Sequence, residues 1–120
     1  MRPRILVIDD DELNRKIVSE ILEDAGYQPV TADSGMAGLN MLKETGHIKV
    51  VLLDWMMPDM DGITVLKRIR YEKQTKDIPV IMLTALDKRD QVQEAIENGA
   101  DNYIVKPFDD EKLLTKVRDI

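Results

Sequence analysis

The chain has 120 residues and a formal net charge of -6, from 17 Lys and Arg against 23 Asp and Glu. Its length suits one globular domain, and 43% hydrophobic residues exclude a disordered or low-complexity chain. The acidic balance argues against direct binding to nucleic acid. The absence of Cys and the single His exclude disulfides, thiolate sites and multi-His metal sites. The chemistry must therefore depend on carboxylates, hydroxyls or lysines.

The apolar segments of the chain are short. The longest runs, at residues 5–8, 50–53 and 80–83, fall far below the roughly 20 residues that a membrane span needs. The acidic residues 9–12 also interrupt the first apolar run too early for a signal peptide. We therefore expect no membrane span and a cytoplasmic location.

These three runs and two weaker ones, at residues 29–32 and 103–105, predict strands. They are rich in Val and Ile and do not alternate between apolar and polar residues. Continuous apolar runs are typical of strands that are covered on both faces, as in a parallel sheet.

Apolar residues at helical spacing lie between these predicted strands, and glycines close three of the patterns, at Gly26, Gly46 and Gly99. Strict alternation of strand and helix favours an α/β fold with helices on both faces of the sheet. Because no repeat or linker divides the sequence, we expect a single domain over residues 1–120. It is either a stand-alone domain or the N-terminal part of a longer protein.

Reactive side chains cluster where the predicted strands end. In an open parallel sheet, ligands bind at the carboxyl ends of the strands. The polar residues at those ends are Asp9, Asp10, Asp11, Asp54, Thr84 and Lys106.

This set of side chains suits a metal-assisted phosphoryl transfer. Two carboxylates about 5 Å apart repel by roughly 3 kcal/mol at an effective dielectric of about 20, so the acids need a counter-charge. Mg²⁺ prefers oxygen ligands and is usually held by one or two carboxylates together with phosphate oxygens. Thr84 and Lys106 could then donate hydrogen bonds to a phosphoryl group on a carboxylate nucleophile.

Each residue also has a purely structural interpretation. The acidic triplet could cap a helix N-terminus, and Lys106 could be a surface lysine in a loop. Asp54 is harder to explain in this way, because it directly follows the predicted buried strand at residues 50–53. The joint placement of these residues at consecutive strand ends favours a functional site.

Four segments in the same order resemble the receiver domain of two-component response regulators, a family similar to the chemotaxis response regulator. The matching segments are residues 5–10, 53–62, 78–85 and 99–108. The resemblance covers essentially the whole chain. It implies a flavodoxin-like, doubly wound (βα)5 fold with a five-stranded parallel sheet of order 2-1-3-4-5.

The resemblance also assigns the acidic residues. Asp54 matches the phosphoacceptor, which also binds the metal. Asp10 and the main-chain carbonyl of Met56 match direct Mg²⁺ ligands, and Asp9 matches an indirect one.

Thr84 and Lys106 match the two residues that contact the phosphoryl group, and Tyr103 matches an aromatic switch residue that turns inward as Thr84 moves. From its position alone, Tyr103 could equally be a half-buried strand residue with its hydroxyl in water. The peptide bond between Lys106 and Pro107 matches one that is cis, a form accessible in practice only before Pro.

Two neighbouring features carry weaker expectations. Pro58 and Gly62 fit a tight loop beside the site, and we expect the glycine to permit a positive φ. His47 falls in a polar loop before the strand at residues 50–53, where we expect it to be solvent-exposed and not a phosphate carrier.

The resemblance implies a phosphorylation-activated switch, and thus a signalling module that catalyses only its own phosphoryl transfer and dephosphorylation. The donor would be a sensor histidine kinase or a histidine phosphotransfer protein. Phosphorylation would change the face formed by the fourth helix, the fifth strand and the fifth helix, which controls an output domain or partner. We expect a monomer before phosphorylation, because Asn102 stands where many dimerising relatives have an acid.

Two other functions are compatible with an α/β sheet. A haloacid-dehalogenase-like Mg²⁺ phosphatase wants a second acid two residues after its Asp nucleophile, and here that residue is Met56. A flavodoxin-type FMN protein wants a phosphate-binding loop after its first strand, where this chain has acids.

The resemblance also bears on the lifetime of the phosphorylated form. The residues placed to orient the hydrolytic water are the second after the acceptor and the second after the Thr, Met56 and Leu86. Because both are apolar, we expect slow self-dephosphorylation.

Overall fold

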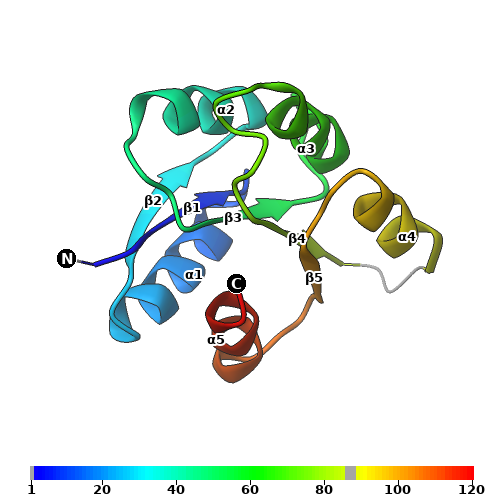
Figure 1. Cartoon of the computed structure of the whole chain (residues 1–120). Coiled ribbons are helices and arrows are strands. Elements are labelled where there is room, and N and C mark those ends of the chain that lie inside the picture. The colour runs from blue at the N-terminus through cyan, green and yellow to red at the C-terminus, as the bar shows by residue number, and fades with distance from the viewer. Residues whose placement is uncertain (1, 86–88) are drawn as a thin grey trace.

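The computed structural model describes residues 2–85 and 89–120, with only the backbone of Arg89. Strands and helices alternate along the whole described chain (Figure 1). Their bounds are β1 Arg4–Ile8, α1 Glu12–Asp24, β2 Gln28–Ala32, α2 Gly35–Glu44, β3 Val50–Asp54, α3 Gly62–Tyr71, β4 Val80–Thr84, α4 Arg89–Glu97, β5 Asn102–Val105 and α5 Asp110–Arg118. The expected α/β class is thereby confirmed.

The strands form one parallel sheet of order β2-β1-β3-β4-β5, as the resemblance implied. In register, Ile8 of β1 pairs with Leu53 of β3, and Thr84 of β4 pairs with Val105 of β5. This register aligns the carboxyl ends of β1, β3, β4 and β5. The residues that follow these ends therefore meet at one edge of the sheet.

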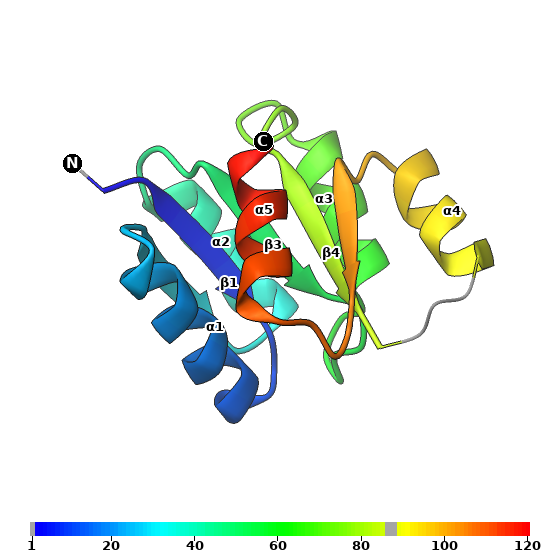
Figure 2. The same cartoon turned by 90° about the horizontal axis from the view of Figure 1, so that it is seen from below.

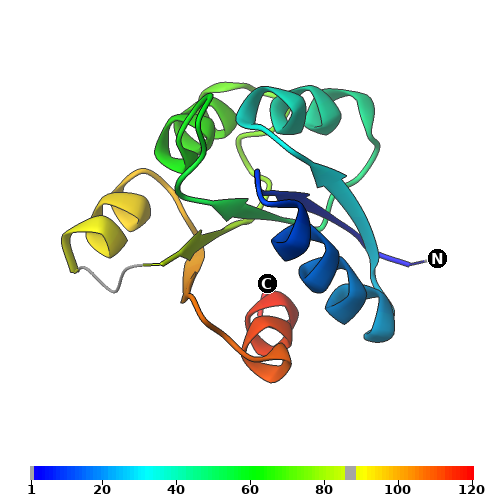
Figure 3. The ribbon, with the colours of Figure 1, turned by 180° about the vertical axis from the view of Figure 1, so that it is seen from behind.

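Each central strand is buried on both faces, because helices cover both sides of the sheet. Ile5 and Val7 of β1 belong to the cluster under α1 and α5, while Leu6 and Ile8 belong to the cluster under α2, α3 and α4. Figure 2 shows α1 and α5 side by side over one face, and Figure 3 shows α2 and α3 over the other. Burial on both faces explains why the strand sequences read as unbroken apolar runs.

The helix ends follow the predicted signals in most places. Gly26 and Gly99 lie just beyond α1 and α4 with φ of 95° and 100°, the left-handed conformation that favours glycine. The α2 helix differs, because it ends at Glu44 with an extended Thr45 as its C-cap, and Gly46 has no positive φ. None of the helices within the described ranges is long and apolar enough to cross a bilayer.

Candidate phosphoacceptor and metal site

Three carboxylates converge where β1 and β3 end. Asp9 and Asp54 are buried, with 1% and 7% of their surfaces exposed, and Asp10 is exposed beside them. Carboxylate oxygens of all three lie within 4.8 Å of one another. The expected convergence of these acids is therefore observed.

Lys106 approaches this cluster from the end of β5. Its Nζ donates a hydrogen bond of 2.7 Å to Oδ1 of Asp54 and lies 3.7 Å from Oδ2 of Asp9. The main-chain N–H of Lys106 donates to the carbonyl of Thr84 at 2.7 Å, which ties β5 to the end of β4. The Lys106–Pro107 peptide bond is cis, as the resemblance implied.

The electrostatics of Asp54 reflect this crowding. Burial raises the pKa of the Asp54 carboxyl, the hydrogen bond and the charge of Lys106 lower it, and the charges of Asp9 and Asp10 raise it again. The net pKa is raised, so burial and the neighbouring carboxylates outweigh Lys106. One lysine leaves the site with unbalanced negative charge.

The residues present fit a hard divalent cation. Asp9, Asp10 and Asp54 offer oxygen ligands from two strand ends, and the exposed Asp10 leaves one side of the cluster open to solvent. Mg²⁺ keeps several water ligands and is usually held by only one or two protein carboxylates, which such a half-open cluster allows.

Thr84 lies at the carboxyl end of β4, and Tyr103 lies further from that edge, on the neighbouring β5. Thr84 is 3% exposed at the carboxyl end of β4, level with Val105 on β5. Tyr103 is half-buried against the hydrophobic cluster under α2, α3 and α4, and Nζ of Lys116 lies 5.8 Å from the centroid of its ring. The structure therefore puts Thr84 at the site edge and Tyr103 two residues before Val105 on the neighbouring strand.

The loop between β3 and α3 borders the site. Trp55 and Met57 point into the core with 9% and 8% of their surfaces exposed, whereas Met56 between them is 70% exposed. The carboxylate of Asp59 accepts hydrogen bonds of 3.3 Å from the main-chain N–H groups of Gly35 and Met36, at the first turn of α2. This contact anchors the loop to α2.

The expected role of Gly62 was wrong. Its φ is not positive; glycine is needed there for space. An added Cβ would lie 2.5 Å from the carbonyl oxygen of Asp54 and 2.9 Å from Cα of Trp55. The N–H of Gly62 also donates to the carbonyl of Trp55 at 2.7 Å. The start of α3 thus packs directly on the backbone that carries Asp54.

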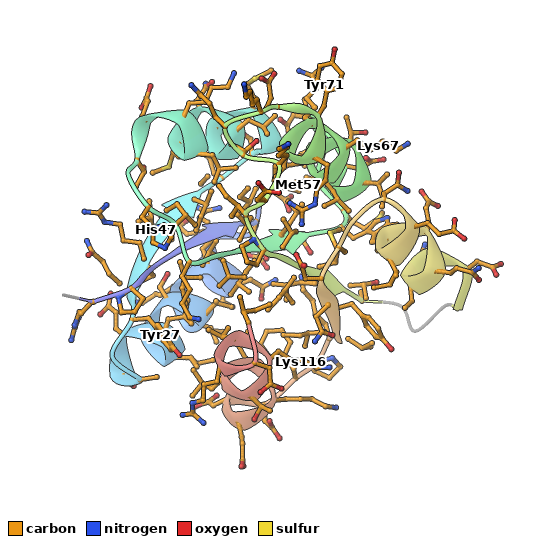
Figure 4. All side chains as sticks on the ribbon, viewed as in Figure 1. Tyr27, His47, Met57, Lys67, Tyr71 and Lys116 are labelled. Atoms are coloured by element: carbon orange, nitrogen blue, oxygen red, sulfur yellow. The ribbon has the colours of Figure 1, made fainter. Side chains whose placement is uncertain are left out.

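The remaining sequence candidates lie outside the cluster. Asp11 is the N-cap of α1 and accepts a hydrogen bond from the N–H of Leu13, so the acidic triplet divides between a site and a cap. His47 is exposed in the loop between α2 and β3, as expected (Figure 4). Leu86, which the resemblance places to orient the hydrolytic water, lies outside the described residues.

The structure adds residues that the sequence did not single out. Nη1 of Arg15, on α1, donates a 2.8 Å hydrogen bond to the main-chain carbonyl of Asp9. A groove of about 600 Å³ also opens beside the cluster, between α1 and the connection from β5 to α5. Asp9 and Lys106 line the groove at the site, and Ile17, Pro107 and Phe108 contribute apolar surface. Neither feature has a periodic or motif signal in the sequence.

Comparison with known families identifies the chain. Residues 5–118 match the model of the response regulator receiver domain. The chain therefore belongs to the response regulator receiver domain family, and its flavodoxin-like fold with strand order 2-1-3-4-5 agrees with that assignment.

Curated relatives come from both transcriptional and chemotaxis proteins. The chain is 40% identical over 118 residues to the phosphate regulon transcriptional regulatory protein PhoB of Escherichia coli, covering 98% of this chain and 51% of PhoB. It is 44% identical over 115 residues to the chemotaxis protein CheY-3 of Vibrio cholerae, covering 95% of this chain and 88% of CheY-3. The chain thus spans about half the length of PhoB and most of CheY-3.

Solved structures agree with this fold. Chemotaxis protein CheY4 of Vibrio cholerae superposes with a TM-score of 0.94 at 33% identity, covering 100% of this chain and 99% of that one. The receiver domain of the Francisella response regulator 1452 superposes with a TM-score of 0.89 at 36% identity, covering 98% and 95%. The fold thus matches these receiver structures over nearly all of the chain.

Proposed function

We propose that this receiver domain is a switch controlled by phosphorylation of Asp54. The observation that carries the proposal is the ion pair of 2.7 Å between Lys106 and Asp54, inside a cluster of three carboxylates at the ends of β1 and β3. A nucleophilic carboxylate, a site for a divalent cation and a lysine for a phosphoryl oxygen are the parts that phosphoryl transfer to Asp requires.

The donor is the phosphohistidine of a sensor histidine kinase or histidine phosphotransfer protein, and the exchange takes place in the cytoplasm. A carboxylate oxygen of Asp54 attacks the phosphorus, a P–O bond forms, and the P–N bond breaks with its electron pair remaining on the imidazole. Asp10, Asp54, the Met56 carbonyl and, indirectly, Asp9 hold Mg²⁺. When bound, Mg²⁺ supplies positive charge to the phosphoryl oxygens.

Lys106 and Thr84 act on the product. The phosphoryl group adds about 1.5 to 2 negative charges and three acceptor oxygens, which replace the carboxylate as the partner of Lys106. Thr84, buried at the end of β4, donates its hydroxyl to a phosphoryl oxygen. This shift at β4 and β5 draws Tyr103 inward and changes the face formed by α4, β5 and α5.

The output is an attached domain or a partner protein that recognises this face. We expect a monomer before phosphorylation, with no direct nucleic-acid or membrane contact by this domain. Some matched relatives, such as PhoB, carry transcriptional names, while CheY-3 carries a chemotaxis name. Both kinds of output are therefore compatible with the receiver alone.

Phosphoramidate tests the proposal, because it contains the P–N bond of a phosphohistidine. With Mg²⁺, intact-mass measurement should show one added phosphoryl group on the parent protein. No addition should occur with excess EDTA or on an Asp54→Asn variant, while an Asp61→Asn variant should react like the parent. Equal labelling of Asp54→Asn would contradict the proposal.

A further inference from the structure

Asp10 is the one acid of the cluster with no side-chain anchor among the described residues. Asp54 is held by Lys106, and Asp9 accepts a hydrogen bond of 2.9 Å from the N–H of Asp11. The Asp10 carboxylate is exposed and accepts no hydrogen bond from another described residue. The direction in which Asp10 points therefore depends on its backbone.

Arg15 holds that backbone in place. Nη1 of Arg15 donates a 2.8 Å hydrogen bond to the carbonyl oxygen of Asp9, which belongs to the peptide unit between Asp9 and Asp10. A peptide unit is planar, so fixing its oxygen fixes the orientation of the bond that leads to Asp10. The N–H of Asp9 is also bound, to the carbonyl of Ala32 on β2 at 3.1 Å.

The location of Arg15 suits this role. It is the fourth residue of α1, and helical side chains point back toward the N-terminus, which here is the connection from β1. The side chain is half-buried, whereas the side chain of the neighbouring Lys16 is exposed and contacts no hydrogen-bond or ion-pair partner in the described parts of the chain. Arg15 and Lys16 thus carry the same charge on one helix, but only Arg15 contacts the backbone of Asp9.

The contact orients the site without neutralising it. Among the described residues, no carboxylate lies within 4.0 Å of the Arg15 guanidinium, in contrast to Lys106, which pairs with two of the acids. Arg15 therefore leaves the carboxylate oxygens free for a cation. As a positive charge near the cluster, it should by itself weaken cation binding slightly.

We propose that Arg15 is a positioning residue of the magnesium site, which presents Asp10 to the metal by fixing the Asp9–Asp10 peptide. The inference rests on the metal site of the proposed function. Partners outside the ligand set of a metal typically contribute 10–100-fold to its affinity.

The expected change in Mg²⁺ affinity has opposite signs for the loss of a positioning contact and for the loss of a positive charge. Loss of a positive charge alone tightens Mg²⁺ binding, so Lys16→Gln should bind Mg²⁺ as well as the parent or slightly better. Loss of the hydrogen bond in Arg15→Gln should instead weaken binding by about 10-fold. Arg15→Lys, which keeps a donor and the charge, should recover part of the affinity and also serves if Arg15→Gln folds poorly.

Titration of Mg²⁺ followed by Trp55 fluorescence and by calorimetry measures these affinities without any phosphorylation. A double-mutant cycle then tests the route through Asp10: in an Asp10→Asn background, Arg15→Gln should have less than a 2-fold effect, on the order of 0.4 kcal/mol. A merely structural role would weaken binding equally in both backgrounds and would overturn the inference.

The result also separates the inference from the proposed function. If the parent binds Mg²⁺ and is phosphorylated on Asp54 while Arg15→Gln binds Mg²⁺ as tightly as Lys16→Gln, only the role of Arg15 is wrong. If the parent shows no saturable Mg²⁺ binding, the metal site of the proposed function is wrong and the role of Arg15 falls with it.

Discussion

The ammonium of Lys106 on the connection after β5 lies 2.7 Å from the carboxylate of Asp54 at the end of β3, so one short ion pair joins the carboxyl ends of two strands that flank β4 in the sheet. The same ammonium lies 3.7 Å from Asp9. One positive charge thus faces three carboxylates that approach within 4.8 Å of one another. The site therefore carries an excess of negative charge, whose distribution a bound cation or phosphorylation would change.

The raised pKa of Asp54 predicts how the stability of the metal-free protein depends on pH. A group whose pKa is higher in the folded state favours folding while it is protonated, and this contribution is lost as the pH rises through the folded pKa. The Asp54→Asn variant has no carboxyl to ionise at this position, so it does not lose this stability as the pH rises. The gain in stability of Asp54→Asn over the parent should be absent well below pH 3.8 and should grow as the pH rises.

Asp61 is a control, because its pKa is shifted in the opposite direction to that of Asp54. The hydrogen bonds from the side chain and backbone of Thr64 lower the pKa of its carboxyl, so its contribution is present at neutral pH and lost as the pH falls. Asp61→Asn should therefore be less stable than the parent at neutral pH, with a difference that shrinks in acid. Urea unfolding of the parent, Asp54→Asn and Asp61→Asn measures both trends. The measurements should run from about pH 3, near the usual pKa of a carboxyl group, to about pH 7.

Magnesium should stabilise the folded protein. At about 100 times its Kd, Mg²⁺ should raise the free energy of unfolding by about 2.7 kcal/mol through preferential binding to the native state. Trp55 directly follows Asp54 and is the only Trp in the chain, so its fluorescence should report the titration.

Variants of the acidic triplet make this metal prediction specific. Asp10→Ala should strongly reduce the melting-temperature shift, whereas Asp11→Asn should keep it, because Asp11 caps α1 and Asn also caps helices well. A Mg²⁺ response of Asp10→Ala equal to that of the parent would remove Asp10 from the site.

The order of elements and the site edge could be predicted because their signals are local. Continuous apolar runs mark strands buried on both faces, and a parallel sheet brings the residues after them to one edge, which is why Asp54 and Lys106 could be predicted to meet. The assignment of their roles came from the family resemblance.

The contacts that escaped prediction depend on packing between elements distant in sequence or on a side chain reaching across a turn. Gly62 has no room for a side chain because the start of α3 packs against the backbone at the end of β3. Local turn preferences do not predict this packing. The hydrogen bonds that Asp59 accepts from the first turn of α2 join residues that are 23 and 24 positions apart. Arg15 reads as one more charged residue of an amphipathic helix until its carbonyl partner is seen.

The close packing of Gly62 predicts a large effect of one methyl group. Gly62→Ala would place Cβ against backbone atoms of Asp54 and Trp55, which cannot move aside separately, and should cost about 1–3 kcal/mol of stability. Gly46→Ala is the matched control, because its Cβ would meet only the flexible end of Arg4. Similar urea midpoints for both variants would show that the backbone at Asp54 yields easily.

The exposed Met56 predicts a long-lived phosphorylated state. Its side chain is 70% exposed and apolar, so it cannot orient the hydrolytic water. Lost positioning of this kind costs roughly 10- to 100-fold in rate, on the order of 1.4 to 3 kcal/mol in barrier. Met56→Asn, alone and combined with Leu86→Glu, should speed the decay of the phosphorylated protein in Mg²⁺ buffer.

A Met36→Asn variant makes the same chemical change at another exposed methionine, on α2, and should leave the decay rate unchanged. Decay of the parent within seconds, or no acceleration by the polar pair, would contradict the argument from these two side chains.

The identity of the modified residue tests the central claim most directly. An acyl phosphate, unlike a phosphate ester or a free carboxylate, is reduced by borohydride, which converts a phosphorylated Asp into homoserine. After treatment with phosphoramidate, Mg²⁺ and borohydride, peptide mass spectrometry should find homoserine at position 54 and nowhere else. Homoserine at Asp9 or Asp10 instead, or a phosphoryl group retained on a hydroxyl side chain, would contradict the account.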